Sequence, residues 1–304
     1  MSQTKVTLIT GCSSGFGFMA AKDLAKRGHI VYASMREARG KNAKAAGELQ
    51  AFGHSEALQL HVLELDVTSD ESVASAAKQV VDGQGRIDVV VNNAGVMPVG
   101  VTEAFTVDQF RDNLEVNLLG VFRIAREVLP HMRKAGEGLL VNVSTVIGRV
   151  AIPFFGIYQA SKWGLEGLTE TLRYELSASG VDVVIVEPGP FATELVANSP
   201  GPKDEARLSD NSELQRTLDG MMGVFQNNVF QNPEAPVDPQ ILVDSLIGLI
   251  EMQPGERPFR TVAGLDFGVR EINGLTDPYR TQALAGLGLA HLEGVGSVAR
   301  GDKE

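Results

Sequence analysis

Cysteine is almost missing from this sequence, since Cys12 is the only one in 304 residues. A single thiol excludes an internal disulfide and any zinc site built from several cysteines, and we expect no metal. Aromatic residues reach only 6%, and Trp163 is the only tryptophan. Basic residues are also few, with 27 Lys and Arg against 38 Asp and Glu and a formal net charge of −11. Because affinity for nucleic acid comes from clustered Lys and Arg, we expect no nucleic-acid partner.

Long apolar runs are lacking as well. The apolar stretch near the start ends at Gly11, which is too short for the core of a signal peptide. The most apolar later stretch, residues 139–158, contains Asn142, Ser144 and Arg149, whereas a bilayer span needs about 20 mostly apolar residues. We therefore expect a cytoplasmic protein without a membrane partner.

Short β-branched runs alternate with longer helix-like patterns along most of the chain. The runs cover 6–10, 30–33, 58–65, 87–91, 139–143 and 181–186, and the helix-like patterns cover 15–27, 41–53, 70–82, 107–134 and 157–178. This alternation is typical of βαβ units, and the consecutive apolar positions indicate strands covered on both faces. The predicted fold is α/β: a doubly wound parallel sheet of Rossmann type with helices on both faces, in a single domain.

The pattern changes after Pro190. Residues 191–232 have ends rich in Pro and Gly around a helix-like island at 214–230, which predicts a mobile lid. The expected core thus covers about 5–193 and 237–265, with a helix at 239–252 and an edge strand at 260–263. Residues 266–304 form a C-terminal extension, in which we expect a terminal helix at 282–292, weakened by Gly286 and Gly288.

Glycines punctuate the turn that follows the first strand, where Thr10–Gly17 reads TGCSSGFG. Glycine lets such a turn tighten and lets the backbone approach a ligand, and the helix behind it offers free N–H groups to a phosphate. The spacing also suits an ordinary turn, but its place between strand and helix is what a dinucleotide site requires. The expected cofactor contacts here are Gly11, Ser13, Ser14, Gly15, Phe16 and Gly17.

The end of the second strand bears on the choice of cofactor. An acidic residue there typically binds the ribose 2′-OH of NAD, whereas an Arg accommodates the 2′-phosphate of NADP. Met35 occupies the expected acidic position and Arg36 follows it, which favours NADP. Glu37 would instead favour NAD if the strand ended two residues later.

Polar residues also follow the third and fourth strands, at the sheet edge where ligands of such folds bind. The candidates are Asp66 and Val67 after one strand and Asn93, Ala94 and Gly95 after the other. A helix cap and an ordinary turn are the alternative interpretations.

Ser144 ends the fifth strand, and Tyr158 and Lys162 follow at the start of the next helix. Residues four apart lie on one helical face. A tyrosine normally titrates near 10, but a neighbouring ammonium favours the phenolate and lowers that pKa. Taken alone, such a pair is more often a surface lysine beside a partly buried tyrosine.

Taken together, these residues resemble the short-chain dehydrogenase/reductase family over about residues 5–193. The matches are TGxxxGxG at Thr10–Gly17, Asp66-Val67, NNAG at Asn92–Gly95, Asn117, Ser144, YxxxK at Tyr158–Lys162, and Pro188-Gly189 with Thr193. Residues 31–36 and 158–175 are most similar to NADP-preferring steroid- and retinol-type members. Two features depart from the family's pattern. The chain extends beyond the usual core, and the glycine loop carries no Arg or Lys, which keeps NAD open as the cofactor.

The resemblance implies a role for each matched residue. Tyr158 would be the general acid/base, and Lys162 would lower its pKa and bind the nicotinamide ribose. Ser144 would donate a hydrogen bond to the substrate oxygen, and Asn117 would bind a water that links Lys162 to solvent. The residues that would line the nicotinamide carboxamide are Pro188, Gly189 and Thr193.

The predicted function is NADP(H)-dependent interconversion of a secondary alcohol and a ketone. We expect a mainly apolar small molecule, because Met221, Met222, Phe225 and Phe230 lie in the lid, with Phe154 and Phe155 as the opposite wall. An NAD-dependent relative, a non-catalytic cofactor sensor and a non-redox enzyme of this fold are the alternatives. Ser144 lies in no G-x-S-x-G elbow, which argues against a hydrolase built on it. We also predict a homo-oligomer that pairs through the helices at 107–134 and 157–178.

Overall fold

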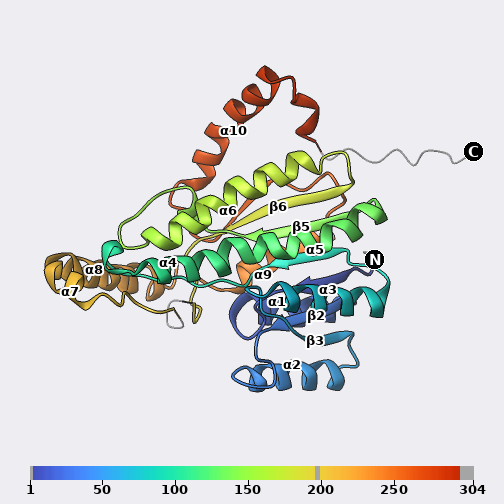
Figure 1. Ribbon diagram of the computed structural model, residues 1–304, viewed down its shortest axis with the longest axis horizontal. Helices are drawn as coiled ribbons and strands as arrows, with labels where there is room; N and C mark the ends of the chain where they lie inside the picture. The colour runs from blue at the N-terminus through green and yellow to red at the C-terminus, as the bar shows by residue number, and fades with distance from the viewer. Residues whose placement is uncertain (1–2, 196–198, 295–304) are drawn as a thin grey trace, which may run out of the picture.

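Seven strands form one parallel sheet within residues 3–195 and 199–294, which the computed structural model describes (Figure 1). Their order across the sheet is β3-β2-β1-β4-β5-β6-β7. They are β1 (Val6–Ile9), β2 (Ile30–Met35), β3 (Leu60–Glu64), β4 (Val89–Asn92), β5 (Gly138–Val143), β6 (Val181–Pro188) and β7 (Arg260–Ala263). The order reverses between β1 and β4, and ligands of open α/β sheets bind beside such a reversal at the carboxyl ends of the strands.

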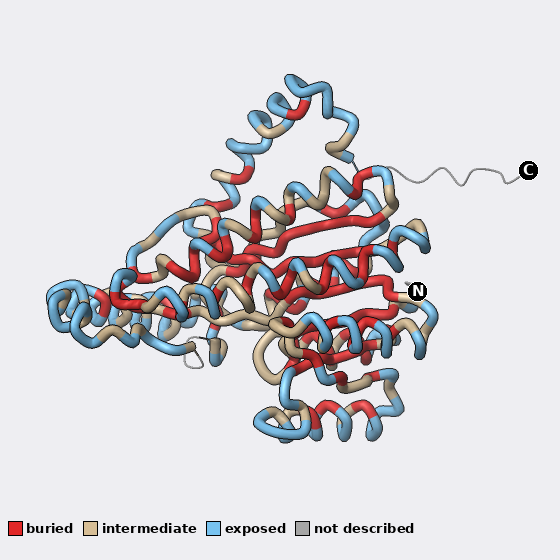
Figure 2. The backbone as a smooth tube through the Cα atoms, in the orientation of Figure 1, coloured by how far each residue is buried: buried red, intermediate tan, exposed pale blue. Residues whose placement is uncertain are grey.

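Helices cover both faces of the sheet, as expected. One face carries α1 (Gly15–Lys26), α2 (Ala43–Ser55) and α9 (Gln240–Glu251). The other carries α3 (Asp70–Gln84), α5 (Gly120–Ala135) and α6 (Gly156–Glu175). Each layer closes its own apolar core against the strands, which are buried between the exposed outer helix faces (Figure 2). The predicted doubly wound, single-domain fold is thus confirmed, and the first six strands end within two residues of their predicted limits.

The long helical pattern at 107–134 is not one uniform helix. It consists of α4 (Val107–Leu114), a π-helical turn at Glu115–Leu119, and α5. Thr106 and Gln109 form a capping box that begins α4. Asn117 therefore lies in a π-helical turn, a feature that occurs frequently at functional sites.

The segment predicted as a lid contains two helices, α7 (Glu205–Asp210) and α8 (Ser212–Phe225), and a π-helical turn at Gln226–Phe230. They lie beyond one end of the sheet, at the left of Figure 1. Gln109 Nε2 donates to the carbonyl of Gly201 over 2.7 Å and so ties this segment to α4. Residues 196–198 of the predicted lid are outside the described residues.

The prediction for the C-terminal extension was wrong about its helix. Helix α10 spans Val269–Gly286 and so begins 13 residues before the predicted start, followed by a short 3-10 turn at Ala290–Leu292. Pro278 lies inside α10. The helix tolerates this proline because the carbonyl of Gly274, which loses its usual donor, belongs to an exposed residue. The helix projects from the body of the molecule (Figure 1). Residues 295–304 of the predicted extension are outside the described part.

Among the described residues, the helices are too short or too polar to cross a bilayer.

Candidate active site

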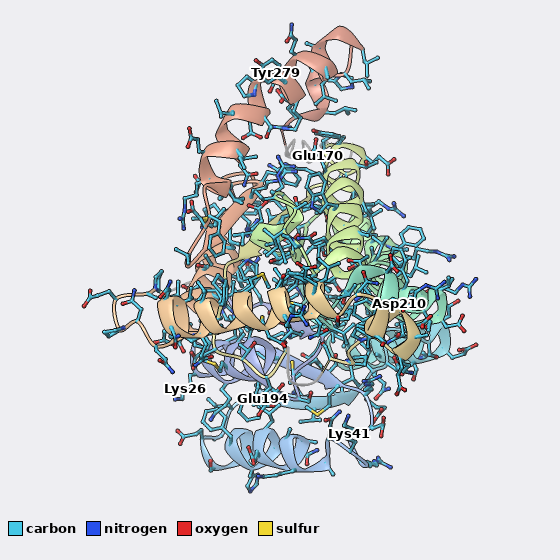
Figure 3. All side chains as sticks on the ribbon, turned by 90° about the vertical axis from the view of Figure 1, so that its left-hand side faces the viewer. Lys26, Lys41, Glu170, Glu194, Asp210 and Tyr279 are labelled. Atoms are coloured by element: carbon cyan, nitrogen blue, oxygen red, sulfur yellow. The ribbon has the colours of Figure 1, made fainter. Side chains whose placement is uncertain are left out.

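A cavity of about 530 Å³ lies at the carboxyl ends of the strands, and it extends from the β1/β4 reversal to the α8 segment. Figure 3 views this end, with α8 crossing the front of the molecule and the cavity-lining residues Lys41 and Glu194 below it. The predicted site residues that line the cavity are Gly11, Ser13, Ser14, Gly15, Phe16, Arg36, Asp66, Val67, Asn93, Ala94, Gly95, Ser144, Tyr158, Lys162, Pro188, Gly189 and Thr193. Gly17 and Asn117 are not among the described residues that line it.

The glycine loop is braced by the turn that follows β4. Thr10 Oγ1 accepts hydrogen bonds of 3.0 Å from the backbone N–H groups of Asn93 and Ala94. Asn93 Nδ2 in turn donates to the carbonyls of Thr10 and Gly11. Gly11 has a φ of 73°, and a Cβ there would lie 2.8 Å from Ala94 Cα, so only glycine fits. These hydrogen bonds fix the conformation of the loop against the turn that follows β4.

The start of α1 suits a phosphate. Ser14 precedes the helix without capping it through its side chain, and the first turn carries no acidic residue. Its N–H groups thus keep their capacity to bind an anion. Gly17 packs behind the loop, since a Cβ there would lie 2.6 Å from both Asn93 Nδ2 and the Gly11 carbonyl oxygen.

Two cations lie where the second strand ends. Met35 is buried, Arg36 is exposed, and both line the cavity together with Lys41. The expectation for this end named Arg36 but missed Lys41, because no pattern in the sequence indicated how the following turn would fold back. Glu37 is outside the described lining; its backbone N–H donates to Glu64 Oε1 over 2.6 Å.

Residues that follow β3 and residues at and after the end of β6 also line the cavity. Asp66 Oδ1 accepts from the backbone N–H of Thr68 over 2.9 Å, so the carboxylate also caps its own turn, and Val67 packs against Gly120 of α5. At the end of β6, a Cβ on Gly189 would lie 2.0 Å from the Leu265 carbonyl oxygen. Thr193 lies against Gly15, at 3.8 Å from the position that a Cβ would take there.

Ser144, Tyr158 and Lys162 meet at the inner end of the cavity, and all three are buried. Ser144 Oγ has no hydrogen-bond partner among the described residues. Lys162 Nζ donates to the Val143 carbonyl over 2.7 Å and lies 6.0 Å from the centre of the Tyr158 ring. One strand end and one helix start thus place a hydroxyl, a phenol and an amine around the same space.

The expected lowering of the Tyr158 pKa does not occur in the protein alone. Burial raises the pKa of Tyr158, and contact with the Thr145 side chain offsets only part of this effect. Burial also lowers the pKa of Lys162 to about 8, against the attraction of Glu166. The desolvation of both groups therefore outweighs their mutual effect.

Asn117 is fully buried, and its side chain is engaged elsewhere than expected. Its Oδ1 accepts from the backbone N–H of Val96 over 2.9 Å, and its Nδ2 donates to the Val96 carbonyl and to Ser161 Oγ. The amide therefore joins the loop after β4 to α6. The predicted water-binding role would have to come from another atom of this residue.

The far end of the cavity is mainly apolar. Its lining includes Met97, Ile152, Phe155, Met221, Met222, Phe225, Phe230 and Phe267. Phe155 forms part of the wall as expected, but Phe154 does not. Its backbone has a φ of 71°, and its ring packs with Val101 and Leu218 in a small separate core.

These observations define a class of protein. The cavity combines a glycine loop suited to a dinucleotide with a buried serine, tyrosine and lysine, and this combination is typical of a nicotinamide-dependent oxidoreductase. The first turn of α1, which has no side-chain cap, fits such a cofactor, and so does the glycine at position 11. The Ser144 hydroxyl, which has no hydrogen-bond partner in the described part of the chain, fits it as well.

Comparison with known proteins identifies the family. The family model for short chain dehydrogenase matches residues 5–203. The chain is 37% identical over 196 residues to 3-ketodihydrosphingosine reductase of Bacteroides thetaiotaomicron, covering 64% of this chain and 67% of that one. It is 40% identical to retinol dehydrogenase 16 of Mus musculus over 70% of this chain, a match that spans 62% of the relative's length. A crystal structure of a short-chain dehydrogenase from Streptomyces avermitilis aligns with a TM-score of 0.73 at 29% identity, covering 94% of this chain and 98% of that one.

The chain belongs to the short-chain dehydrogenase family. It is an oxidoreductase that acts on alcohol and carbonyl groups with NAD(P).

Proposed function

We propose that this protein is an NADP(H)-dependent oxidoreductase that interconverts a secondary alcohol and a ketone on a mainly apolar small molecule. The observation that carries this proposal is the buried group of Ser144, Tyr158 and Lys162 at the inner end of a cavity with an apolar far wall. Hydride transfer is the chemistry that the bound nicotinamide supplies.

Tyr158 gives its phenolic proton to the carbonyl oxygen during reduction and takes the hydroxyl proton during oxidation. Because burial raises the pKa of Tyr158, the phenol form prevails in the free protein, which suits a proton donor. Ser144 donates a hydrogen bond to the same oxygen and holds it in place. Lys162 binds the ribose and favours the phenolate when the proton leaves.

The cations at the end of β2 support NADP as the preferred cofactor. Arg36 and Lys41 both line this end of the cavity, whereas Glu37 is tied to Glu64 through its backbone. A guanidinium pairs well with a phosphate, and a carboxylate would repel it.

The apolar wall supports a hydrocarbon-rich substrate. Methionine and phenylalanine side chains from the α8 segment and from the loop before α6 face the same space. Two relatives are named for 3-ketodihydrosphingosine and retinol, which are both largely hydrocarbon. Sugars and charged acids would leave polar groups unpaired against this wall.

A screen of apolar ketones, sugars and polyols with NADPH and NADH, followed by the absorbance of the reduced nicotinamide, tests the proposal. We expect turnover of apolar ketones with NADPH and none in Tyr158→Phe. Activity limited to polyols or sugars would refute the apolar site.

We also propose that residues 191–232 act as a lid. Met221, Met222 and Phe225 on α8 and Phe230 line the cavity, so ligand binding should order this segment. Hydrogen exchange of residues 214–230 should be fast in the free protein and should slow with NADPH and ketone bound. Strong protection in the free protein would contradict the lid.

The predicted homo-oligomer receives support from exposed apolar side chains on the expected helices. Phe122 on α5 and Trp163 on α6 are 41% and 50% exposed. The cytoplasmic location stays a prediction.

A further inference from the structure

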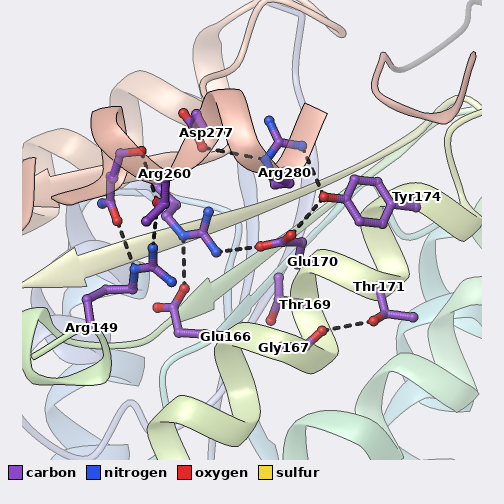
Figure 4. A network of polar contacts seen from close by, with 12 residues as sticks. Arg149, Glu166, Gly167, Thr169, Glu170, Thr171, Tyr174, Arg260, Asp277 and Arg280 are labelled. Atoms are coloured by element: carbon purple, nitrogen blue, oxygen red, sulfur yellow. Dashed lines mark hydrogen bonds and ion pairs between the residues drawn. The ribbon is translucent and has the colours of Figure 1, made fainter. Parts of the chain in front are cut away.

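A buried ionic cluster lies behind Ser144, and the reaction described above does not use it. Glu166 lies on α6 one turn beyond Lys162, Glu187 lies on β6, and Arg260 lies on β7. Arg260 Nε is 3.0 Å from Glu166 Oε2, and Arg260 Nη2 is 2.7 Å from Glu170 Oε2 (Figure 4). A third carboxylate oxygen, Glu187 Oε1, lies 3.7 Å from Arg260 Nε.

This cluster also ties helix α10 to the active-site loop. Asn273 Nδ2 donates to Glu187 Oε2 over 2.6 Å. Arg149, in the loop after Ser144, donates from Nε to Asn273 Oδ1 over 2.9 Å. The charged groups of this cluster come from four parts of the fold: Lys162 and Glu170 on α6, Glu187 on β6, Arg260 on β7 and Arg149 in the loop.

The cluster places two buried carboxyl groups, Glu166 and Glu187, beside the same guanidinium. Ionising two such groups side by side is costly, although the charge of Arg149 also favours their ionised forms. Burial raises the pKa of Glu166, and the neighbouring Ser144 side chain and Arg260 offset part of this rise. Burial together with the charge of Glu166 raises the pKa of Glu187 to about 7. A proton therefore stays in the cluster at moderately acidic pH.

Three of the buried oxygens without a hydrogen-bond partner among the described residues belong to Ser144 and this cluster: Ser144 Oγ, Glu166 Oε1 and Glu187 Oε1. The first two lie close to Gly148, where a Cβ would be 2.9 Å from Ser144 Oγ and 3.6 Å from Glu166 Oε1. A side chain at position 148 would therefore fill the space next to both oxygens.

We propose that Glu166 is a positioning residue for Ser144: as the neutral acid it donates a hydrogen bond to Ser144 Oγ and so directs the serine's own hydrogen at the substrate oxygen. A serine hydroxyl has one hydrogen and two acceptor sites. If Glu166 is ionised, it competes with the substrate for that hydrogen, and the developing charge on the substrate oxygen loses a donor. This inference rests on the proposed function.

The first test is the pH dependence of single-turnover reduction of 2-decanone by the NADPH-loaded protein. Below the pKa of Lys162, which is about 8, the wild-type rate should fall about tenfold as pH rises and Glu166 ionises, which is the scale of one hydrogen bond. Glu166→Gln keeps a permanent N–H donor, so this fall should disappear. Glu170→Gln removes a charge from the same arginine without reaching Ser144 and should keep the wild-type profile.

A double-mutant cycle separates an effect through Ser144 from one through Lys162. In a Ser144→Ala background, Glu166→Gln should leave the pH profile unchanged. If it still alters the profile there, or if the single Glu166→Gln variant keeps the wild-type fall, the proposal is wrong.

The second test needs no substrate, so it stands even if 2-decanone is not reduced. Infrared titration of the free protein should show a protonated carboxylic acid band that Glu166→Gln removes and Glu170→Gln retains. Ser144→Ala, which leaves the arginine cluster intact, should shift this band because it removes the acceptor. A band absent throughout the titration, or insensitive to Ser144→Ala, would overturn the proposal whether or not Glu166→Gln folds.

Discussion

Removing the guanidinium of Arg36 should weaken NADPH binding and leave NADH binding nearly unchanged. Arg36 follows buried Met35 at the end of β2 and lines the cavity with an exposed side chain. Its turn is held by other groups, since Asn42 Nδ2 donates to the Arg36 carbonyl over 2.7 Å. Glu64 also accepts from the backbone N–H groups of Glu37 and Ala38. Arg36→Ala should therefore remove the charge without reshaping the site.

The expected magnitude follows from the exposure of this side chain. A hydrogen bond between charged groups contributes about 1.5–3 kcal/mol, and solvent screening at an exposed site favours the lower end. Lys41 remains nearby and compensates for part of the lost charge. We expect a loss of about 1.5–2 kcal/mol, or a Kd for NADPH about 10–30 times higher.

Calorimetric titration of NADPH and NADH at low and high salt measures this difference. Arg39→Ala is the matched control, because Arg39 is exposed in the same turn but is outside the described lining of the cavity. An equal loss of affinity for both cofactors would mean that Arg36 is structural. A wild type that binds NADH more tightly would refute the reasoning and point to Glu37.

The other predictions concern chemistry, stability and assembly. Tyr158→Phe should abolish hydride transfer in single-turnover absorbance while NADPH still binds, and near-normal transfer would remove Tyr158 from its role. Lys162→Met should raise the Kd for NADPH as well, and an unchanged Kd would exclude contact with the ribose. Glu187 has a raised pKa of about 7 in the folded protein, so its contribution to stability falls as pH rises from about 4.5 to 7. Glu187→Gln should therefore stabilise the protein by about 1–3 kcal/mol at about pH 8 but not at about pH 5. Thermal unfolding of both proteins at the two pH values measures this difference. Light scattering should show an oligomer that Trp163→Glu and Phe122→Glu weaken, and a wild-type mass of 32.5 kDa at micromolar concentration would exclude it.

The sheet and its helices could be predicted because their signals are local. A parallel strand buried on both faces is a short apolar run, and β6 is buried at all eight positions. The same local reasoning gave wrong predictions where the backbone conformation could not be inferred from the residue types. Phe154 adopts a left-handed conformation that turns its ring into a separate core, and α10 begins 13 residues before the predicted start and contains Pro278.

The side chains expected around the substrate oxygen could also be predicted from local signals. The side chains that govern the protonation of this site could not. Tyr158 and Lys162 are one helical turn apart, so their meeting follows from spacing alone. Arg260 reaches Glu166 and Glu187 only because β7 pairs with β6, with Glu187 beside Val262. No periodicity connects strands so far apart in the chain. Burial likewise decided the sign of the Tyr158 pKa shift, and burial depends on the finished fold. A motif can thus identify which atoms meet the substrate, but the proton that each holds depends on tertiary contacts.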